Sequence, residues 1–114
     1  LASLCDEAFL RTPPPKSTGR DLFHLPWLQA KLDKLSALSP VDVQASLCSF
    51  TAQTISEAIA EFAPDCRAVY VCGGGACNRT LMHELARRMP QRHVDTKHPD
   101  SGCFVSSLIF LILR

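Results

Sequence analysis

The sequence predicts one small α/β domain that is rich in helix and contains a few strands. It has 114 residues, of which 46% are hydrophobic and 20% charged, and this profile suits a single globular domain. Apolar residues recur every three or four positions in three segments, which predicts helices, and an apolar run at residues 68–72 predicts a strand. The formal net charge of +1 provides no field that would attract nucleic acid, so we expect no nucleic-acid partner.

Residues 1–20 predict a loop, and a short helix is expected to follow it. Three prolines at 13–15 hold an extended backbone, and the Ser, Thr and Gly after them favour a turn. From Asp21 onward, leucines recur at helical spacing. They are Leu22, Leu25, Leu28, Leu32 and Leu35. Pro26 fits such a helix only near its first turn or at a break.

A long helix is predicted to begin after Ser39. Ser39 is a good N-cap, Pro40 suits the first helical position and Asp42 places an acid in the first turn. Apolar residues then form one stripe that must pack on another element, until the helix ends before Pro64. The stripe consists of Cys48, Ala52, Ile55, Ile59 and Phe62.

Residues 68–72 predict a strand that is buried on both faces, because the run has no polar alternation. Three glycines end this strand, and Asn78 can cap another helix. The inner side of that helix is expected to consist of Leu81, Met82, Leu85 and Met89. We expect residues 93–95 to begin a second strand, and we place Trp27 and Tyr70 in the core.

The order of strand, glycine turn and helix favours an anion site. A glycine turn lets a ligand approach the backbone closely, and the next helix directs N–H groups and the positive end of its dipole at an anion. A plain tight turn without a ligand is the alternative.

A dinucleotide site is a second interpretation of the same turn. Gly73 and Gly75, followed by an acid at Asp95, imitate a dinucleotide fingerprint. The imitation is imperfect, because Asn78 stands where the third Gly or Ala belongs. The strand also follows a long helix instead of opening a βαβ unit. The spacing of a P-loop is absent from the glycine triplet.

No metal site is predicted. The six cysteines contain no C-x-x-C pair, and the histidines on predicted helices have no partner at ligand spacing. The apolar run at 108–113 is too short to span a bilayer, which takes about 20 residues as a helix. The start of the chain lacks a signal-peptide pattern, so a cytoplasmic location is the default expectation.

Three stretches, taken in order, resemble anhydro-N-acetylmuramic acid kinase: residues 13–23, Trp27-Leu28 and residues 71–78. The resemblance covers roughly residues 5–96 and implies the C-terminal lobe of an actin-like ATPase fold, in which two α/β lobes enclose a nucleotide cleft. It implies a cytoplasmic phosphotransferase of amino-sugar metabolism. In that family ATP phosphorylates 1,6-anhydro-N-acetylmuramic acid while water opens its internal ring. The product is N-acetylmuramic acid 6-phosphate, formed in peptidoglycan recycling.

The resemblance also implies roles for individual residues, with ATP and Mg²⁺ as cofactors. The residues that would lie against the sugar and phosphates of the nucleotide are Gly73, Gly74, Gly75, Ala76 and Asn78. A cleft-lining stretch would consist of Lys16, Ser17, Thr18, Gly19 and Arg20, for which an exposed basic loop is the alternative. A homodimer is compatible with the resemblance.

Two departures limit what this chain is expected to do. The family's first phosphate loop and its catalytic aspartate belong to the N-terminal lobe, and no part of this chain matches them. We therefore expect no catalytic residue here and no turnover by the chain alone. Residues 1–96 are interpreted as an incomplete C-terminal lobe, and residues 97–114 as a divergent, truncated or frame-shifted apolar tail. The alternatives are a noncatalytic module that docks through residues 103–113 and a small dinucleotide-binding domain.

Overall fold

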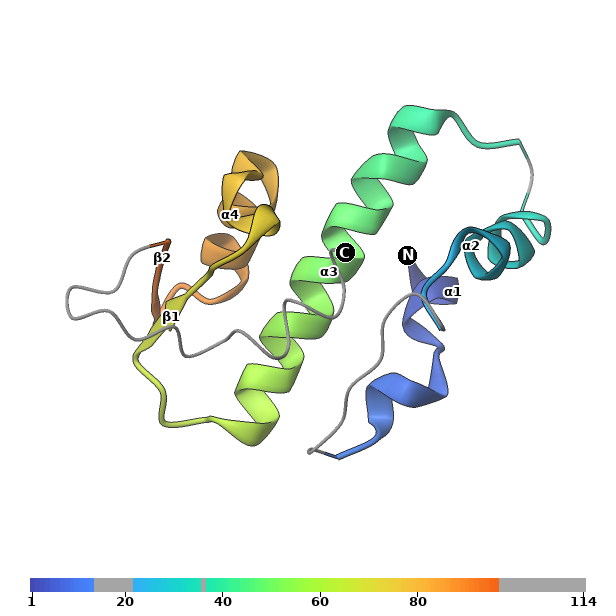
Figure 1. Ribbon diagram of the computed structural model, residues 1–114. Helices are drawn as coiled ribbons and strands as arrows, with labels where there is room; N and C mark the ends of the chain where they lie inside the picture. The colour runs from blue at the N-terminus through green and yellow to red at the C-terminus, as the bar shows by residue number, and fades with distance from the viewer. Residues whose placement is uncertain (14–21, 36, 97–114) are drawn as a thin grey trace.

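A long central helix organises the computed structural model, which describes residues 1–13, 22–35 and 37–96. In chain order the elements are α1 (Ala2–Cys5), η1 (Ala8–Arg11), α2 (Leu25–Leu32), α3 (Pro40–Phe62), β1 (Ala68–Tyr70), η2 (Gly74–Cys77), α4 (Arg79–Arg88) and β2 (His93–Asp95). Helix α3 has α4 and the two strands on one side, and α1 and α2 on the other (Figure 1). The predicted α/β class, rich in helix with a few strands, is confirmed.

Two predicted segments fall outside the described residues. The second part of the loop predicted at 1–20 lies within residues 14–21, and the apolar tail lies within residues 97–114. The cleft-lining stretch from Lys16 to Arg20 is part of the first of these segments. The prediction of a loop is wrong for the first part of residues 1–20, where α1 and η1 form and Leu4 is buried.

Helix α3 begins as its sequence predicts. The hydroxyl of Ser39 accepts a hydrogen bond from the backbone N–H of Asp42 at 3.2 Å and donates one to the carboxylate of Asp42 at 2.9 Å. Pro40 is the first residue of the helix. These contacts satisfy an N–H group that has no partner inside the helix, which fixes where α3 starts.

Helix α2 is shorter than the leucine spacing predicts. It extends from Leu25 to Leu32, with Pro26 in its first turn as expected, and Leu22 and Leu35 lie outside it. None of its residues is fully buried. The reason is that α2 lies at the edge of the described structure, where it contacts only one side of α3 (Figure 1).

The two strands form a parallel sheet, with Ala68 opposite His93 and Tyr70 opposite Asp95. Because η2 and α4 connect them, β1, α4 and β2 make a βαβ unit. The second strand predicted at 93–95 is thereby confirmed. The expectation that the first strand does not open a βαβ unit is wrong, because the chain returns through α4 to run parallel to β1.

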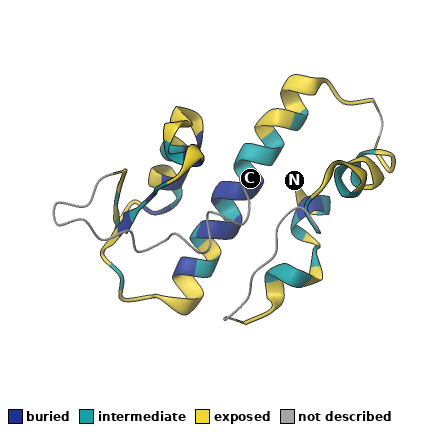
Figure 2. Cartoon of the chain, viewed as in Figure 1, coloured by how far each residue is buried: buried dark blue, intermediate teal, exposed yellow. Residues whose placement is uncertain are grey.

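The core lies where α3 and α4 meet β1 (Figure 2). Its buried residues are Ala52, Ile55, Ile59, Val69, Val71, Leu81, Leu85 and Met89. The predicted inner side of α4 is confirmed, with Met82 packed partly buried against the same cluster. The stripe predicted on α3 is confirmed except at Phe62, which is 43% exposed because α3 ends there and the chain turns away.

The prediction that residues 68–72 are buried on both faces is wrong for one face. Val69 and Val71 are buried, whereas Ala68 is exposed and Tyr70 and Cys72 are half-buried. The reason is that α3 and α4 both pack against the face that carries Val69 and Val71. Tyr70 is therefore not part of this core.

The side chain of Arg92 links the two chain segments that lead into β1 and β2. Nε of Arg92 donates to the carbonyl of Cys66 at 3.1 Å, and Nη2 donates to the carbonyl of Pro64 at the same distance. These bonds join the turn before β2 to the segment between α3 and β1. Charged donors give hydrogen bonds stronger than neutral ones, so this contact holds the entry to both strands.

Replacing this arginine should destabilise the sheet. We expect Arg92→Ala to lower the free energy of unfolding by about 1–3 kcal/mol, because two carbonyls lose a charged donor. Urea denaturation followed by circular dichroism measures the change. Arg67→Ala is the matched control, since its side chain is exposed, and should change stability by less than about 0.5 kcal/mol. Equal effects of both substitutions would contradict the assignment.

Candidate functional site

The glycine turn predicted as a ligand site leaves the end of β1. Gly73 has φ 84° and ψ −170°, a conformation that side-chain-bearing residues rarely adopt. A Cβ atom built on Gly73 or on Gly74 would meet no atom of the described residues within 4 Å. The backbone conformation therefore requires glycine at 73, whereas packing does not explain the glycine at 74, and the space beside both is open to a ligand.

Helix α4 begins directly after this turn. The side-chain oxygen of Asn78 accepts a hydrogen bond from the backbone N–H of Leu81 at 3.1 Å, so the predicted cap is confirmed. The first turn of the helix holds no acidic residue, and its first residue is Arg79, which is exposed. A cation at this end adds to the positive end of the helix dipole. The turn is therefore electropositive and suited to an anion.

The five residues predicted to contact a nucleotide form one continuous turn. Gly73, Gly74 and Asn78 are exposed, Ala76 is half-buried against the core, and Gly75 is buried. Gly75 and Ala76 form the inner side of the turn, and Gly73, Gly74 and Asn78 are exposed to solvent. The structure thus brings these residues together at the end of β1, and the residues from Lys16 to Arg20 lie outside the described part of the chain.

A groove of about 450 Å³ opens beside the turn, between α2, α3 and the start of α4. Its lining residues are Phe23, His24, Leu25, Trp27, Leu28, Gln44, Leu47, Cys48, Phe50, Thr51, Asn78 and Leu81. Asn78 belongs to both the groove and the turn. No pattern in the sequence indicated this groove, because its walls come from three helices far apart along the chain.

Aromatic rings form one wall of the groove. The ring of Phe23 lies edge-on to Trp27 at 5.0 Å and to Phe50 at 6.2 Å between centroids. Trp27 is half-buried here, so its placement in the core is wrong in part. The reason is that α2 covers only one flank of α3.

Three further contacts hold Trp27 in position. Its indole N–H donates to the carboxylate of Glu7 at 2.9 Å. Its backbone N–H donates to Nδ1 of His24, also at 2.9 Å, so that His24 caps α2. The ammonium of Lys31 lies 5.9 Å from the centre of the indole ring. Sequence reasoning assigned His24 no role, since histidine is not among the common N-caps.

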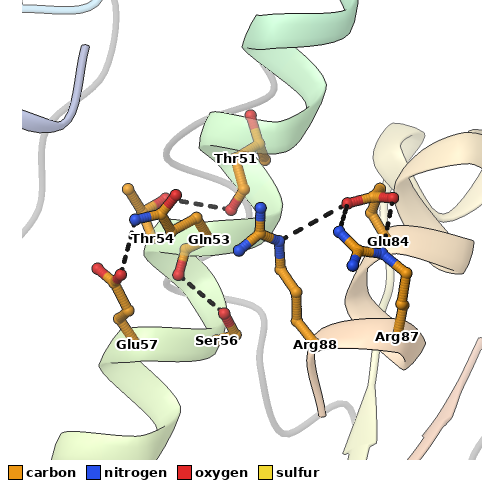
Figure 3. A network of polar contacts seen from close by, with 8 residues as sticks. All are labelled: Thr51, Gln53, Thr54, Ser56, Glu57, Glu84, Arg87 and Arg88. Carbon is orange, nitrogen blue, oxygen red and sulfur yellow. Dashed lines mark hydrogen bonds and ion pairs between the residues drawn. The ribbon is translucent and has the colours of Figure 1, made fainter. Parts of the chain in front are cut away.

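Two sets of polar contacts lie on the neighbouring helices α3 and α4, each within its own helix (Figure 3). On α4, Glu84 pairs with Arg87 at 2.9 Å and with Arg88 at 3.7 Å. The hydrogen bond from Arg87 is the main reason why the pKa of Glu84 is lowered. On α3, the hydroxyls of Thr51 and Thr54 donate to carbonyls of their own helix. The threonine hydroxyls are satisfied within α3, whereas Nε of Arg88 is buried and has no hydrogen-bond partner among the described residues.

Within residues 1–13, 22–35 and 37–96, no group of three or more His, Cys, Asp and Glu side chains is placed to hold a metal ion. The same residues include no helix that is long and apolar enough to cross a membrane. His93 and Asp95 lie on β2, where Nε2 of His93 is 3.5 Å from the carboxylate of Asp95.

Cys48 offers a chemical probe of the groove. Burial raises the pKa of its thiol, and the carboxylate of Glu84 raises it further, so less thiolate is present at neutral pH. We expect iodoacetamide to modify Cys48 more slowly than the exposed Cys77, measured by mass spectrometry of the peptides. Glu84→Gln should quicken the reaction at Cys48 and leave Cys77 unchanged. An unchanged rate at Cys48 would contradict the electrostatic contribution of Glu84.

Comparison with known proteins places this chain in a family. A family model described as anhydro-N-acetylmuramic acid kinase matches residues 1–103, which begins before and ends beyond the range 5–96 of the resemblance. A curated protein with that name from Burkholderia thailandensis is 53% identical over 95 residues, which is 83% of this chain and 25% of that protein. The one from Burkholderia cenocepacia is 49% identical over 94 residues, 82% of this chain and 25% of the relative.

A third relative, from Chromobacterium violaceum, is 55% identical over 95 residues, which cover 82% of this chain and 26% of that protein. The chain thus spans about a quarter of the length of the curated relatives it matches. Neither the family model nor these relatives support the docking module or the dinucleotide-binding domain. The resemblance found in the sequence is confirmed, and the chain belongs to the anhydro-N-acetylmuramic acid kinase family.

Proposed function

We propose that this chain supplies part of the nucleotide site of a kinase that transfers a phosphoryl group from ATP to 1,6-anhydro-N-acetylmuramic acid. The family match carries the proposal, and the relatives that share about half of their aligned residues with this chain are named as that kinase. The product would be N-acetylmuramic acid 6-phosphate, a step of peptidoglycan recycling in the cytoplasm.

The glycine turn supports the ATP part of this proposal. Gly73 and Gly74 leave the space beside the backbone open, and the electropositive start of α4 suits phosphate oxygens. Asn78 lies at the junction of the turn and the groove. In the complete enzyme the stretch from Lys16 to Arg20 would line the same cleft.

The roles proposed for the described residues concern the phosphates of the nucleotide and not Mg²⁺. The metal prefers carboxylate and phosphate oxygens, and the described residues hold no cluster of ligating side chains. We therefore assign Mg²⁺ to none of them and base no step on it. The groups of this chain would bind and orient the nucleotide, while the activation of water belongs to the family's N-terminal lobe.

We also propose that residues 1–96 form an incomplete C-terminal lobe of the actin-like ATPase fold, followed by a divergent tail at 97–114. An α/β lobe requires helices packed on a parallel sheet. Here β1, α4 and β2 form a βαβ unit, and α3 and α4 pack on the same face of the sheet. A parallel sheet of two strands is too small to be stable without such helices.

ATP binding tests the proposed site. Titration calorimetry of the 114-residue chain with ATP and Mg²⁺ should detect weak binding, and Gly74→Asp should weaken it by about tenfold or more, because a carboxylate then faces the phosphates. Ala60→Asp adds the same charge on an exposed position of α3 away from the turn and should bind like the unaltered chain. Equal affinity of both variants, or no binding by the unaltered chain, would refute the site.

The chain alone should not catalyse the reaction. Phosphoryl transfer needs metal ligands, positioned phosphates and an oriented nucleophile together, and the family's catalytic aspartate has no match here. We expect no sugar phosphate by mass spectrometry after incubation of the purified chain with ATP, Mg²⁺ and the anhydro sugar. Measurable product, absent when the chain is omitted, would overturn this expectation.

A further inference from the structure

The cysteines of this chain fall into two groups. Four have free thiols: Cys5, Cys48, Cys66 and Cys77. Cys72, the half-buried residue between β1 and the glycine turn, is instead disulfide-bonded. The sequence contains six cysteines, and the one that remains is Cys103, which lies outside the described residues. The second sulfur of a bond within this chain therefore comes from Cys103.

The topology returns the chain to the neighbourhood of Cys72 before Cys103 is reached. Because β1 and β2 are parallel, their carboxyl ends lie at the same edge of the sheet. At this edge the backbone N–H of Val71 donates to the carbonyl of Asp95 at 2.8 Å, so the chain leaves β2 beside the residue that precedes Cys72. The stretch from Thr96 to Cys103 spans at most about 25 Å, and the Cα atoms of a disulfide lie roughly 4–7 Å apart. The bond is thus within reach.

We propose that Cys72 and Cys103 form a redox-sensitive pair, which fixes the segment after β2 beside the glycine turn when it is oxidised. The oxidant is a low-molecular-weight disulfide such as oxidised glutathione. One cysteine thiolate attacks this disulfide and releases a thiol, and the second cysteine attacks the resulting mixed disulfide and releases another. Two electrons pass from the protein to the small disulfide, and the two protons end on the released thiols. A thiol reductant reverses both steps.

Such a pair suits a switch more than a permanent crosslink. In the cytoplasm, the location expected for this chain, most cysteines are kept reduced, and protein disulfides are usually transient or redox-sensing. Burial raises the pKa of the thiols of Cys5 and Cys48, so little thiolate is present on these two residues at neutral pH to compete in exchange.

The bond bears on the turn because Cys72 is followed directly by Gly73. The space beside Gly73 and Gly74 is open among the described residues. When Cys103 is bonded to Cys72, the residues next to Cys103 are held within about 10 Å of the turn. The effect of the pair rests on the proposed binding of ATP, since the tethered segment competes with the nucleotide for this space and reduction ends the competition.

Differential alkylation of the 114-residue chain identifies the pair. The chain is incubated with oxidised glutathione, and its free thiols are labelled with iodoacetamide in urea. After reduction, the released thiols are labelled with an isotopically heavy form of the reagent. We expect the heavy label on Cys72 and Cys103 alone, in a chain that stays monomeric. A heavy label on Cys77, a covalent dimer or a light label on Cys72 would overturn the pairing.

ATP affinity tests the effect of the pair. In calorimetry the reduced chain should bind ATP about tenfold more tightly than the oxidised chain. Cys103→Ser should bind like the reduced chain in the presence or absence of the oxidant. Cys66→Ser removes a free, half-buried thiol and is the matched control, which should keep the redox response.

The outcomes separate this inference from the proposed function. Equal affinities of the oxidised and the reduced chain would overturn the competition at the turn and leave the proposed ATP site intact. Absence of ATP binding in both redox states and in Cys103→Ser would refute the proposed function together with the competition. The labelling pattern decides independently whether the pair exists.

Discussion

The packing of α3 and α4 against one face of β1 is the constraint on which the described structure depends. Ile55, Val71 and Leu85 come from these three elements and have no exposed surface. Burying side chains of this size stabilises a protein by roughly 1.5–3 kcal/mol each. The pair of strands could not persist without that contribution, since two strands alone are marginal. The end of β1 is therefore held at a fixed place relative to the start of α4.

That placement creates the candidate site. The glycine turn must span from the end of a buried strand to the start of a helix, and Gly73 adopts the positive φ that this change of direction requires. Within the turn Gly75 is buried, and Ala76 packs partly buried against the core. The first turn of α4 then carries the exposed Arg79 and no acidic residue. A rigid electropositive surface is the consequence, and rigidity lowers the entropic cost of binding.

The groove depends on a second, weaker set of contacts. Helix α2 contributes no fully buried residue, and its position relies on the rings around Trp27, on Glu7 and on the cap at His24. Such contacts orient side chains more than they stabilise a fold. The two parts of the candidate site thus differ in their support, because the turn belongs to the core and the groove to its periphery.

The local elements follow from the amino-acid sequence, since caps, proline positions and glycine turns act between residues close together along the chain. Ser39, Pro40 and Asn78 predicted where α3 and α4 begin, and the apolar spacing predicted the buried side of α4. Residues 13–23, Trp27-Leu28 and residues 71–78 together carried the resemblance to the family. Only the tertiary structure decided which face of β1 is covered, that α4 returns the chain to a parallel strand, and that Trp27 lines a groove. These features depend on contacts between segments far apart in the chain. Hydrophobic periodicity predicts that a face is apolar, but it does not predict which element packs against that face.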